Sequence, residues 1–180
     1  MSRLAAIALG SNLASHWGDR EANLREAVAR VAKLGELRAV SSFYDTAPVG
    51  YTDQPNFLNG ALLLETDLEP IELMRALLAI ELAMGRIRTG VPSSAAPAAP
   101  IKGPRIIDLD LLLMGDVVFD NARSPEPLNP TELTLPHPAM AERRFVLQPL
   151  AEIAPNLIDP LSGLSVAQML ARLQPDSKQA

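Results

Sequence analysis

Short apolar runs, most of them bounded by turn residues, predict the β-strands of this chain. They cover residues 4–9, 38–44, 57–65, 106–113 and 117–119. Short runs bounded by Gly, Pro, Asn or Asp are typical of strands rather than helices. Because strand side chains alternate between faces, the fourth run places four apolar residues on one face: Ile107, Leu109, Leu111 and Leu113.

Two longer segments repeat their apolar residues at helical spacing. The first covers residues 19–34, and Gly35 is expected to cap its C-terminal end. The second begins at Pro70, the helix position that proline favours. Its expected apolar face consists of Ile71, Met74, Leu77, Leu78 and Leu82. Two further helices are predicted around residues 140–147 and 166–173.

The order of the main elements is strand, helix, strand, strand, helix, strand. Two adjacent strands in the middle indicate an α+β, ferredoxin-like sandwich with a mostly antiparallel sheet and helices packed on it. A chain of 180 residues fits one domain, so residues 1–180 are expected to form a single unit. Residues 89–100 are rich in Ala, Pro and Ser and carry no charge, which predicts a mobile loop at 89–102.

Composition narrows the function classes. The chain has 16 Lys and Arg against 21 Asp and Glu, a net charge of −5, which excludes a generally basic nucleic-acid or membrane-surface binder. It has no cysteine and 2 histidines, which excludes disulfides, Cys-based zinc sites and multi-histidine metal sites. No apolar run approaches the roughly 18 residues of a membrane span, and the run at 4–9 is too short for a signal peptide. We therefore expect a cytoplasmic protein.

Two acids interrupt the apolar run at 106–113. In a strand, Asp108 and Asp110 point to the same face, about 7 Å apart. Such a pair suits Mg²⁺, which often binds one or two carboxylates together with substrate phosphates. The alternative is a solvated polar face, but Ile106 and Leu112 share that side and argue against it.

The segment before this strand is basic. From residue 85 to residue 107 there is no acid, and there are four cations: Arg86, Arg88, Lys102 and Arg105. Arginines favour fork-like contacts with phosphate oxygens. The alternative, cations at a helix C-terminus, explains the first two cations but not the last two. The pair Arg143-Arg144 could close the other side of a polyphosphate site. Because the chain lacks the P-loop and G-x-G-x-x-G motifs, side chains and metal would have to hold the phosphates.

Several single residues allow two interpretations. Asn59, inside an apolar strand, either reads the edge of a heterocycle or bonds to nearby backbone. Phe57 and Phe145 either stack on a ring or belong to the core. His137 is either a phosphate donor or general acid, or a packed loop histidine. Glu81 either pairs with a cation or a metal-bound water, or lies exposed at the helix margin.

Six motifs then occur in order along the chain. They are Gly10-Ser-Asn-Leu13, Ser41-Ser-Phe-Tyr44, Asp53-Gln-Pro-Asn-Phe-Leu-Asn59, Gly85-Arg-Ile-Arg88, Gly103-Pro-Arg-Ile-Ile-Asp-Leu-Asp110 and Leu135-Pro-His137. Together they resemble the hydroxymethyl-dihydropterin pyrophosphokinase family, and the likeness runs from residue 4 to about residue 160. The G-P-R-x-x-D-L-D motif is the most specific of the six.

The resemblance implies a single ferredoxin-like domain, monomeric, that acts in folate biosynthesis. It implies transfer of the β,γ-pyrophosphoryl group of ATP to the hydroxymethyl oxygen of 6-hydroxymethyl-7,8-dihydropterin, giving AMP and the pterin diphosphate. Two Mg²⁺ ions would assist, and the partners would be the two small substrates, with no nucleic acid and no membrane.

The resemblance also implies roles for individual residues. It implies catalysis by Arg86, Arg105, Asp108 and Asp110, with the two aspartates holding the metal ions. It implies a pterin pocket formed by Thr46, Pro48, Val49, Phe57, Asn59 and Phe145. It implies an ATP site formed by Glu81, Arg88, Leu111, Thr134, His137 and Arg143. Two alternatives remain open: another Mg-dependent phosphoryl or nucleotidyl transferase that uses the Asp-x-Asp pair, and a non-catalytic pterin-binding relative.

Overall fold

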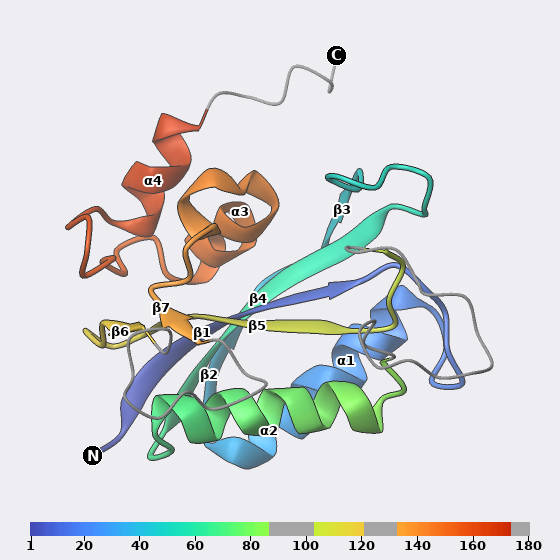
Figure 1. Cartoon of the computed structure of the whole chain (residues 1–180), viewed down its shortest axis with the longest axis horizontal. Helices are drawn as coiled ribbons and strands as arrows, with labels where there is room; N and C mark the ends of the chain where they lie inside the picture. The colour runs from blue at the N-terminus through green and yellow to red at the C-terminus, as the bar shows by residue number, and fades with distance from the viewer. Residues whose placement is uncertain (87–102, 121–132, 174–180) are drawn as a thin grey trace.

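The computed structural model of the chain describes residues 1–86, 103–120 and 133–173. Its centre is an antiparallel sheet in the order β2-β4-β1-β5, in which β3 also pairs with β4 (Figure 1). These strands are β1 (Arg3–Ser11), β2 (Glu36–Val40), β3 (Tyr44–Thr46), β4 (Phe57–Thr66) and β5 (Asp108–Met114). A second, two-stranded sheet consists of β6 (Phe119–Asp120) and β7 (Thr134–Leu135).

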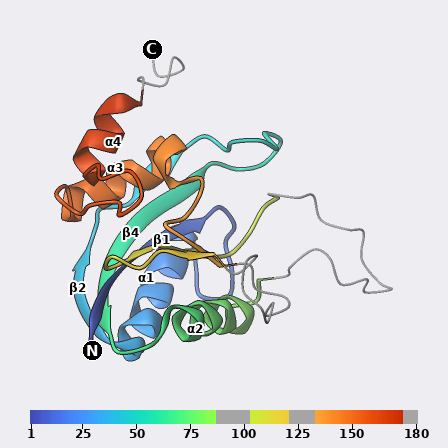
Figure 2. The ribbon, with the colours of Figure 1, turned by 60° about the vertical axis from the view of Figure 1, so that its left-hand side comes forward.

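Helices cover both faces of the main sheet (Figure 1 and Figure 2). One face packs against α1 (Arg20–Val31) and α2 (Pro70–Ala83), the other against α3 (Arg144–Ile153) and α4 (Val166–Arg172). β1 contributes to both cores because its side chains alternate. Ala5, Ile7 and Leu9 face the first helix pair, and Ala6 and Ala8 face the second. The α+β class, with a mostly antiparallel sheet and helices packed on it, is confirmed.

The strand predicted over 38–44 is divided into β2 and β3, both paired with β4. Ser41 lies at the break. Its backbone N–H donates to the carbonyl of Ala61 (2.9 Å), while its hydroxyl accepts from the Ala61 N–H (2.9 Å). A side chain thus takes the place of a backbone carbonyl in the ladder, and regular pairing stops there. The pattern of apolar and polar residues does not reveal that a side chain replaces a backbone group in the pairing.

The face predicted for the strand at 106–113 is correct for three of its four residues. Ile107, Leu109 and Leu111 belong to the core beneath α1 and α2, but Leu113 packs on the opposite face beside Leu112. The pairing of β1 with β5 shifts register at this point, and such a β-bulge reverses the alternation that follows it. The strand itself starts at Asp108, two residues later than predicted.

The buried stripe of α2 differs from the predicted one. It consists of Pro70, Leu73, Leu77 and Glu81, with Ile71 and Met74 partly buried beside it, whereas Leu82 is 74% exposed. The helix begins at Pro70 as predicted and ends in a Schellman motif. In this motif Gly85 adopts φ +89°, and the N–H groups of Gly85 and Arg86 donate to the carbonyls of Leu82 and Glu81.

Other element boundaries also differ. α1 is followed by a 3₁₀ turn, η1 (Ala32–Leu34), and Gly35 has an extended φ of 169° rather than a left-handed cap conformation. Any Cβ at Gly35 would lie 2.2 Å from the carbonyl oxygen of Glu65, so close approach to β4 requires glycine there. The helix predicted at 140–147 is divided into a 3₁₀ turn, η3 (Met140–Glu142), and the first residues of α3, with the extended Arg143 between them.

The remaining predictions concern the last segments. The helix predicted at 166–173 is α4, and the strand predicted at 117–119 is displaced to β6; β7 was not predicted. The loop expected at 89–102 lies outside the described residues. Within the described parts of the chain, no helix is long and apolar enough to cross a membrane.

Candidate active site

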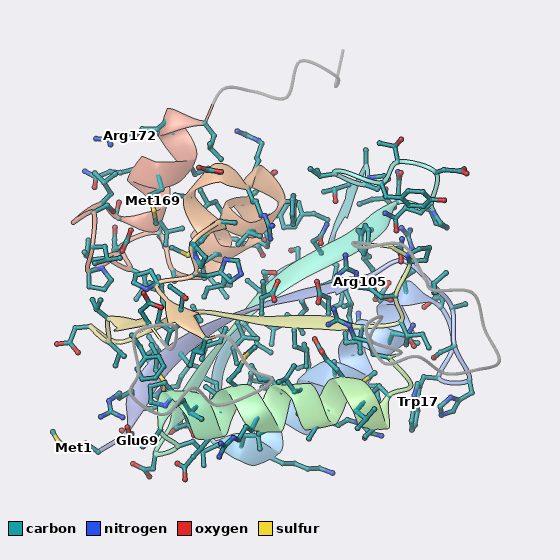
Figure 3. The ribbon with its side chains drawn as sticks, viewed as in Figure 1. Met1, Trp17, Glu69, Arg105, Met169 and Arg172 are labelled. Carbon is teal, nitrogen blue, oxygen red and sulfur yellow. The ribbon has the colours of Figure 1, made fainter. Side chains whose placement is uncertain are left out.

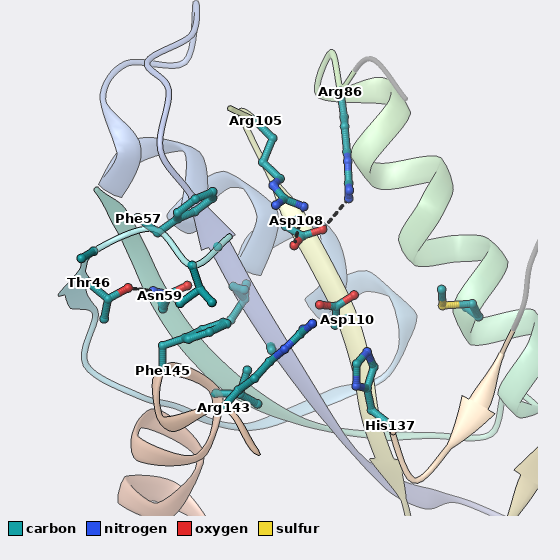
Figure 4. Close-up of a pocket in the computed structure, with 17 residues that line it drawn as sticks. Thr46, Phe57, Asn59, Arg86, Arg105, Asp108, Asp110, His137, Arg143 and Phe145 are labelled. Atoms are coloured by element: carbon teal, nitrogen blue, oxygen red, sulfur yellow. Dashed lines mark hydrogen bonds and ion pairs between the residues drawn. The ribbon is translucent and has the colours of Figure 1, made fainter. Parts of the chain in front are cut away.

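A cavity of about 380 Å³ lies on the face of the sheet that α3 and α4 cover, next to the N-terminal end of α3 (Figure 4). β1, β4 and β5 form its floor, and residues from β3, α3 and the segment after α2 form its sides. Arg105, on the segment leading into β5, lies in the part of the molecule remote from Met1 (Figure 3). The cavity has the size of a small-molecule site.

The floor combines small residues with acids. In the antiparallel pairing of β1 with β5, Ala8 lies opposite Asp110 and Gly10 opposite Asp108. A Cβ at Gly10 would lie 3.2 Å from Asn59 Oδ1 and 3.8 Å from the Cβ of Asp108. Small residues on β1 therefore leave room for a ligand between the β4 and β5 side chains.

Asp108 is held by two arginines. Arg86 Nη1 lies 2.6 Å from its Oδ1, and Arg105 Nη1 lies 3.1 Å from its Oδ2 (Figure 4). All three side chains are largely shielded, with exposures of 15% to 23%. The Nε of Arg105 is buried and has no hydrogen-bond partner within the described residues. A buried donor in a cavity wall indicates a site for an acceptor from a ligand or water.

Glu81 holds Arg86 from below. It is 1% exposed, and its Oε1 accepts hydrogen bonds from Arg86 Nη1 and from the Leu109 backbone N–H, the latter at 2.7 Å. Burial alone lowers the pKa of Arg86, but the charges of Asp108 and Glu81 outweigh burial and raise it. The Schellman turn at Gly85 points this arginine back across α2 toward both acids. The predicted pairing of Glu81 with a cation is confirmed.

Asp110 and His137 lie on the far side of Asp108, next to Arg143 (Figure 4). Burial, together with the charges of Asp108 and Glu81, raises the pKa of Asp110 to about 7. Burial and the charge of Arg143 lower the pKa of His137. A second buried carboxylate close to Asp108 favours a cation beside it, whereas Arg143 offers contacts to an anion.

The opposite half of the cavity is aromatic. Asn59, 6% exposed, donates from Nδ2 to Thr46 Oγ1 at 2.5 Å, and β3 pairs with β4 beside it. Phe57 and Phe145 lie on either side of this pair (Figure 4). Each ring has a guanidinium group near its face, that of Arg105 at 5.3 Å and that of Arg143 at 5.9 Å. The half is shaped for a flat polar ring.

The cavity brings together most of the side chains singled out from the sequence. It is lined by Thr46, Val49, Phe57, Asn59, Arg86, Arg105, Asp108, Asp110, His137, Arg143 and Phe145. Four others do not line it: Glu81 lies beneath it, Leu111 is in the apolar core, Thr134 is not among the lining residues, and Pro48 is not among them either, although its neighbours Ala47 and Val49 are. Arg88 lies outside the described residues.

Asn12, in the motif Gly10-Ser-Asn-Leu13, supports the site although the sequence predicted no role for it. It is 2% exposed, and its Oδ1 accepts from the Arg105 backbone N–H at 2.8 Å. Its Nδ2 donates to Gln54 Oε1 at 2.9 Å and to the Pro55 carbonyl at 3.0 Å. Asn12 therefore ties the segment that carries Arg105 to the segment that precedes β4. The polar turn after an apolar strand was the signal, but its partners are distant in sequence.

The side chains of the cavity fit a metal ion that is coordinated partly by protein carboxylates and partly by a bound substrate. Within the described ranges there is no group of three or more His, Cys, Asp and Glu side chains that could hold a metal ion. Asp108 and Asp110 do lie on one face of β5 and in one cavity. Mg²⁺ commonly uses one or two carboxylates, waters and substrate phosphates rather than an all-protein cage.

Comparisons with known proteins add the following. A family model described as 7,8-dihydro-6-hydroxymethylpterin-pyrophosphokinase (HPPK) matches residues 6–155. A Bacillus subtilis relative, named 2-amino-4-hydroxy-6-hydroxymethyldihydropteridine pyrophosphokinase, is 42% identical over 85% of this chain and 79% of its own length. The Schizosaccharomyces pombe folic acid synthesis protein fol1 is 36% identical over 96% of this chain, and the match spans 21% of that longer protein.

A solved structure agrees on the fold. The wild-type HPPK-DHPS of Plasmodium falciparum superposes with a TM-score of 0.65 at 13% identity. The match covers 95% of this chain and 44% of that one. This chain thus spans less than half of that protein and about a fifth of the fission-yeast relative.

Proposed function

The chain belongs to the 7,8-dihydro-6-hydroxymethylpterin-pyrophosphokinase family, and we propose that it transfers the β,γ-pyrophosphoryl group of ATP to 6-hydroxymethyl-7,8-dihydropterin. The hydroxymethyl oxygen bonds to the β-phosphorus, the bond from that phosphorus to the α-phosphate oxygen breaks, and the hydroxyl proton is released. The products are AMP and the pterin diphosphate, an intermediate of folate biosynthesis.

One observation carries this proposal: a single cavity has an aromatic, amide-bearing half beside a half lined by acids and arginines. The first half suits a flat heterocycle and the second a metal-bound polyphosphate. A transferase with a different acceptor would not require the aromatic half. A binding module without activity would not require Asp108 and Asp110 beside Arg86 and Arg105.

In the pterin half, Phe57 and Phe145 would enclose the ring and Asn59 would read its edge. The amide of Asn59 is oriented by its donation to Thr46 Oγ1. This bond uses one N–H, so the second N–H and the carbonyl oxygen remain to match the donor and acceptor pattern of a pterin. Thr46 would act through Asn59, and Val49, which is 66% exposed, would cover the open side.

In the phosphate half, Asp108 and Asp110 would hold two Mg²⁺ ions. When bound, these ions would neutralise phosphate charge and align the acceptor hydroxyl with the β-phosphorus. Arg86 and Arg105 now share Asp108, so a cation at this carboxylate would compete with both of them. Released, both guanidinium groups would face the transferred phosphates, and Arg105 would also offer its buried Nε–H.

The remaining contacts to ATP would come from His137 and Arg143, which line the cavity beside Asp110. Glu81 would act indirectly by holding Arg86 and the β5 backbone. Arg88, Leu111 and Thr134 stay proposed nucleotide contacts on the family resemblance alone, as does Pro48 for the pterin. That the enzyme is a cytoplasmic monomer of one domain is likewise proposed on the family resemblance alone.

The test is the release of AMP from ATP and Mg²⁺, measured with and without the hydroxymethyl-dihydropterin. AMP that depends on the pterin is expected. Asp110→Ala should nearly abolish it with the fold retained, while Asp116→Ala, at an exposed turn after β5, should leave it unchanged. AMP formed equally without pterin, or full activity in Asp110→Ala, would contradict the proposal.

A further inference from the structure

A very short strand carries one wall of the proposed pterin pocket. β3 consists of Tyr44, Asp45 and Thr46, and each of them pairs with one residue of β4. In the described part of the chain, no strand pairs with its other edge. So short an edge strand has few ladder bonds, and its position depends strongly on side-chain contacts.

Glu152, in the last turn of α3, supplies such contacts. Its Oε1 accepts hydrogen bonds from the backbone N–H and the hydroxyl of Ser42, each 2.9 Å long. Its Oε2 accepts a hydrogen bond of 2.5 Å from the Tyr44 hydroxyl. Bonds to an ionised carboxylate are about twice as strong as neutral ones. An exposed glutamate that receives three donors from one segment tethers that segment to the helix.

The protonation states agree with a tether. The hydrogen bond from Tyr44, followed by the bonds from Ser42, lowers the pKa of Glu152. The same Tyr44–Glu152 bond is the main cause that raises the pKa of Tyr44. At neutral pH the carboxylate is therefore ionised and the phenol protonated, so acceptor and donor are both present.

The contact between Tyr44 and Glu152 also positions two residues of the pocket relative to each other. Tyr44 and Thr46 are two residues apart in an extended strand, so they share a face about 7 Å apart. On α3, Phe145 precedes Glu152 by seven residues, close to two turns and about 10 Å, so both lie on the same side of the helix. Linking Tyr44 to Glu152 thus sets Thr46 opposite Phe145. In Figure 4 Phe145 faces the Asn59–Thr46 pair.

The other face of β3 is fixed separately. Asp45 accepts from Arg20 Nη2 at 2.7 Å and from Asn56 Nδ2 at 2.9 Å, and Arg20 Nη1 donates to the Asn56 carbonyl at 2.8 Å. These bonds attach the β3–β4 turn to the start of α1, on the opposite layer. Loss of the Glu152 tether would therefore loosen β3 relative to α3 without detaching it from β4.

We propose that Glu152 is a positioning residue for the pterin pocket: by holding Ser42 and Tyr44 it sets the width of the slot between Phe145 and the Thr46–Asn59 pair. The proposal rests on the proposed function, since it assigns the slot to the pterin. Glu152 does not line the cavity and touches no proposed ATP contact. Its effect should fall on pterin binding alone.

The experiment compares Glu152→Gln, Tyr44→Phe and the double variant with the wild type, under steady-state conditions and by calorimetric titration with the pterin. Glu26→Gln serves as the matched control, because Glu26 accepts a bond from Arg30 at 2.7 Å on α1, away from the cavity. The pterin KM and Kd should rise about tenfold in Glu152→Gln, since a looser slot must be ordered on binding. The KM for ATP and kcat should change less than about twofold.

Two further readouts separate positioning from general stability. The double variant should bind the pterin no more weakly than Glu152→Gln, because both single changes break the same link. Unchanged pterin affinity in Glu152→Gln would overturn the proposal. Equal losses of affinity for ATP and for the pterin would also overturn it, because they indicate general loosening. If Glu152→Gln fails to fold, Tyr44→Phe, which removes one hydroxyl, provides the test instead. Failure of the proposed function would be seen separately, as wild-type protein without pterin-dependent AMP.

Discussion

At the scale of single residues, the phosphate half of the site depends on how Asp108 is shared. Arg86 and Arg105 both pair with it, and Glu81 pairs with Arg86 from beneath. The arginines that are proposed to contact phosphate are therefore ion-paired with the carboxylate that is proposed to bind metal. A metal–nucleotide complex would satisfy both partners at once, because it brings the cation and the anion together.

Glu81→Gln tests the support beneath Arg86. The change keeps the shape of the side chain but leaves a buried arginine with one carboxylate partner instead of two. We expect the free energy of unfolding to fall by about 1–3 kcal/mol, the typical loss for a buried charge-assisted hydrogen bond. Urea denaturation measures it, with Glu21→Gln on the surface of α1 as the control. Equal stability of both variants would show that Glu81 does not support Arg86.

Burial raises the pKa of Asp110 from its ordinary 3.8 to about 7, which makes metal affinity depend on pH. The carboxyl must lose its proton to bind Mg²⁺, so affinity should rise about tenfold between pH 6 and pH 8. The competing Mn²⁺ ion, followed by electron paramagnetic resonance, provides the measurement. In the metal-free protein the sign is opposite: an acid with a raised pKa reduces stability as pH rises from about 4 toward 7. Asp110→Asn should remove both trends, and a flat profile in the wild type would contradict the assignment.

Among the helices and strands, the sequence predicted those features that depend on residues close together in the chain. Strand alternation placed Asp108 and Asp110 on one face, and this holds because both precede the bulge in β5. The face of α2 was only partly correct: Ile71, Met74 and Leu77 pack against the core, but Leu82 is exposed. Apolar residues occur around most of this helix, so periodicity could not select the buried stripe. Glu81 is buried only because Arg86 and the Leu109 N–H meet it there, and those contacts depend on tertiary structure.

Gly85→Ala tests the element that aims Arg86. Among the described residues, a Cβ at Gly85 would meet only Ile106 Cδ1, at an ordinary 3.6 Å, so the expected cost comes from the φ of +89°. We expect a loss of about 1 kcal/mol in stability, because alanine disfavours positive φ. Gly163→Ala, at φ +70° with no described atom within 4 Å of the new Cβ and away from the cavity, should cost a similar amount. Only Gly85→Ala should also lower kcat, since it redirects Arg86; equal kcat in both variants would contradict this role.

At the scale of the whole molecule, the site forms where the two helical layers meet around one end of the sheet. α2, on one face, supplies Glu81 and leads into Arg86; α3, on the other, supplies Phe145. The class of fold followed from the order of strands and helices. The cavity did not, because it requires the bonds of Asn12, which join segments more than 40 residues apart.

Charge is also distributed at this scale. The chain has a net charge of −5, yet Arg86, Arg105 and Arg143 line one cavity. Asp108 and Asp110 line the same cavity, so it offers groups for a cation and for a polyanion at one place on the surface. This distribution suits a metal–nucleotide substrate and matches the division of the cavity into two halves.

In the proposed reaction two phosphoryl groups move together as one unit, and ³¹P nuclear magnetic resonance of the complete reaction can follow both of them. ATP, Mg²⁺, the hydroxymethyl-dihydropterin and the wild-type protein should give AMP and a pterin diphosphate in equal amounts. The pterin product should show two coupled phosphorus signals. ADP together with a pterin monophosphate would contradict pyrophosphoryl transfer and identify a different transferase.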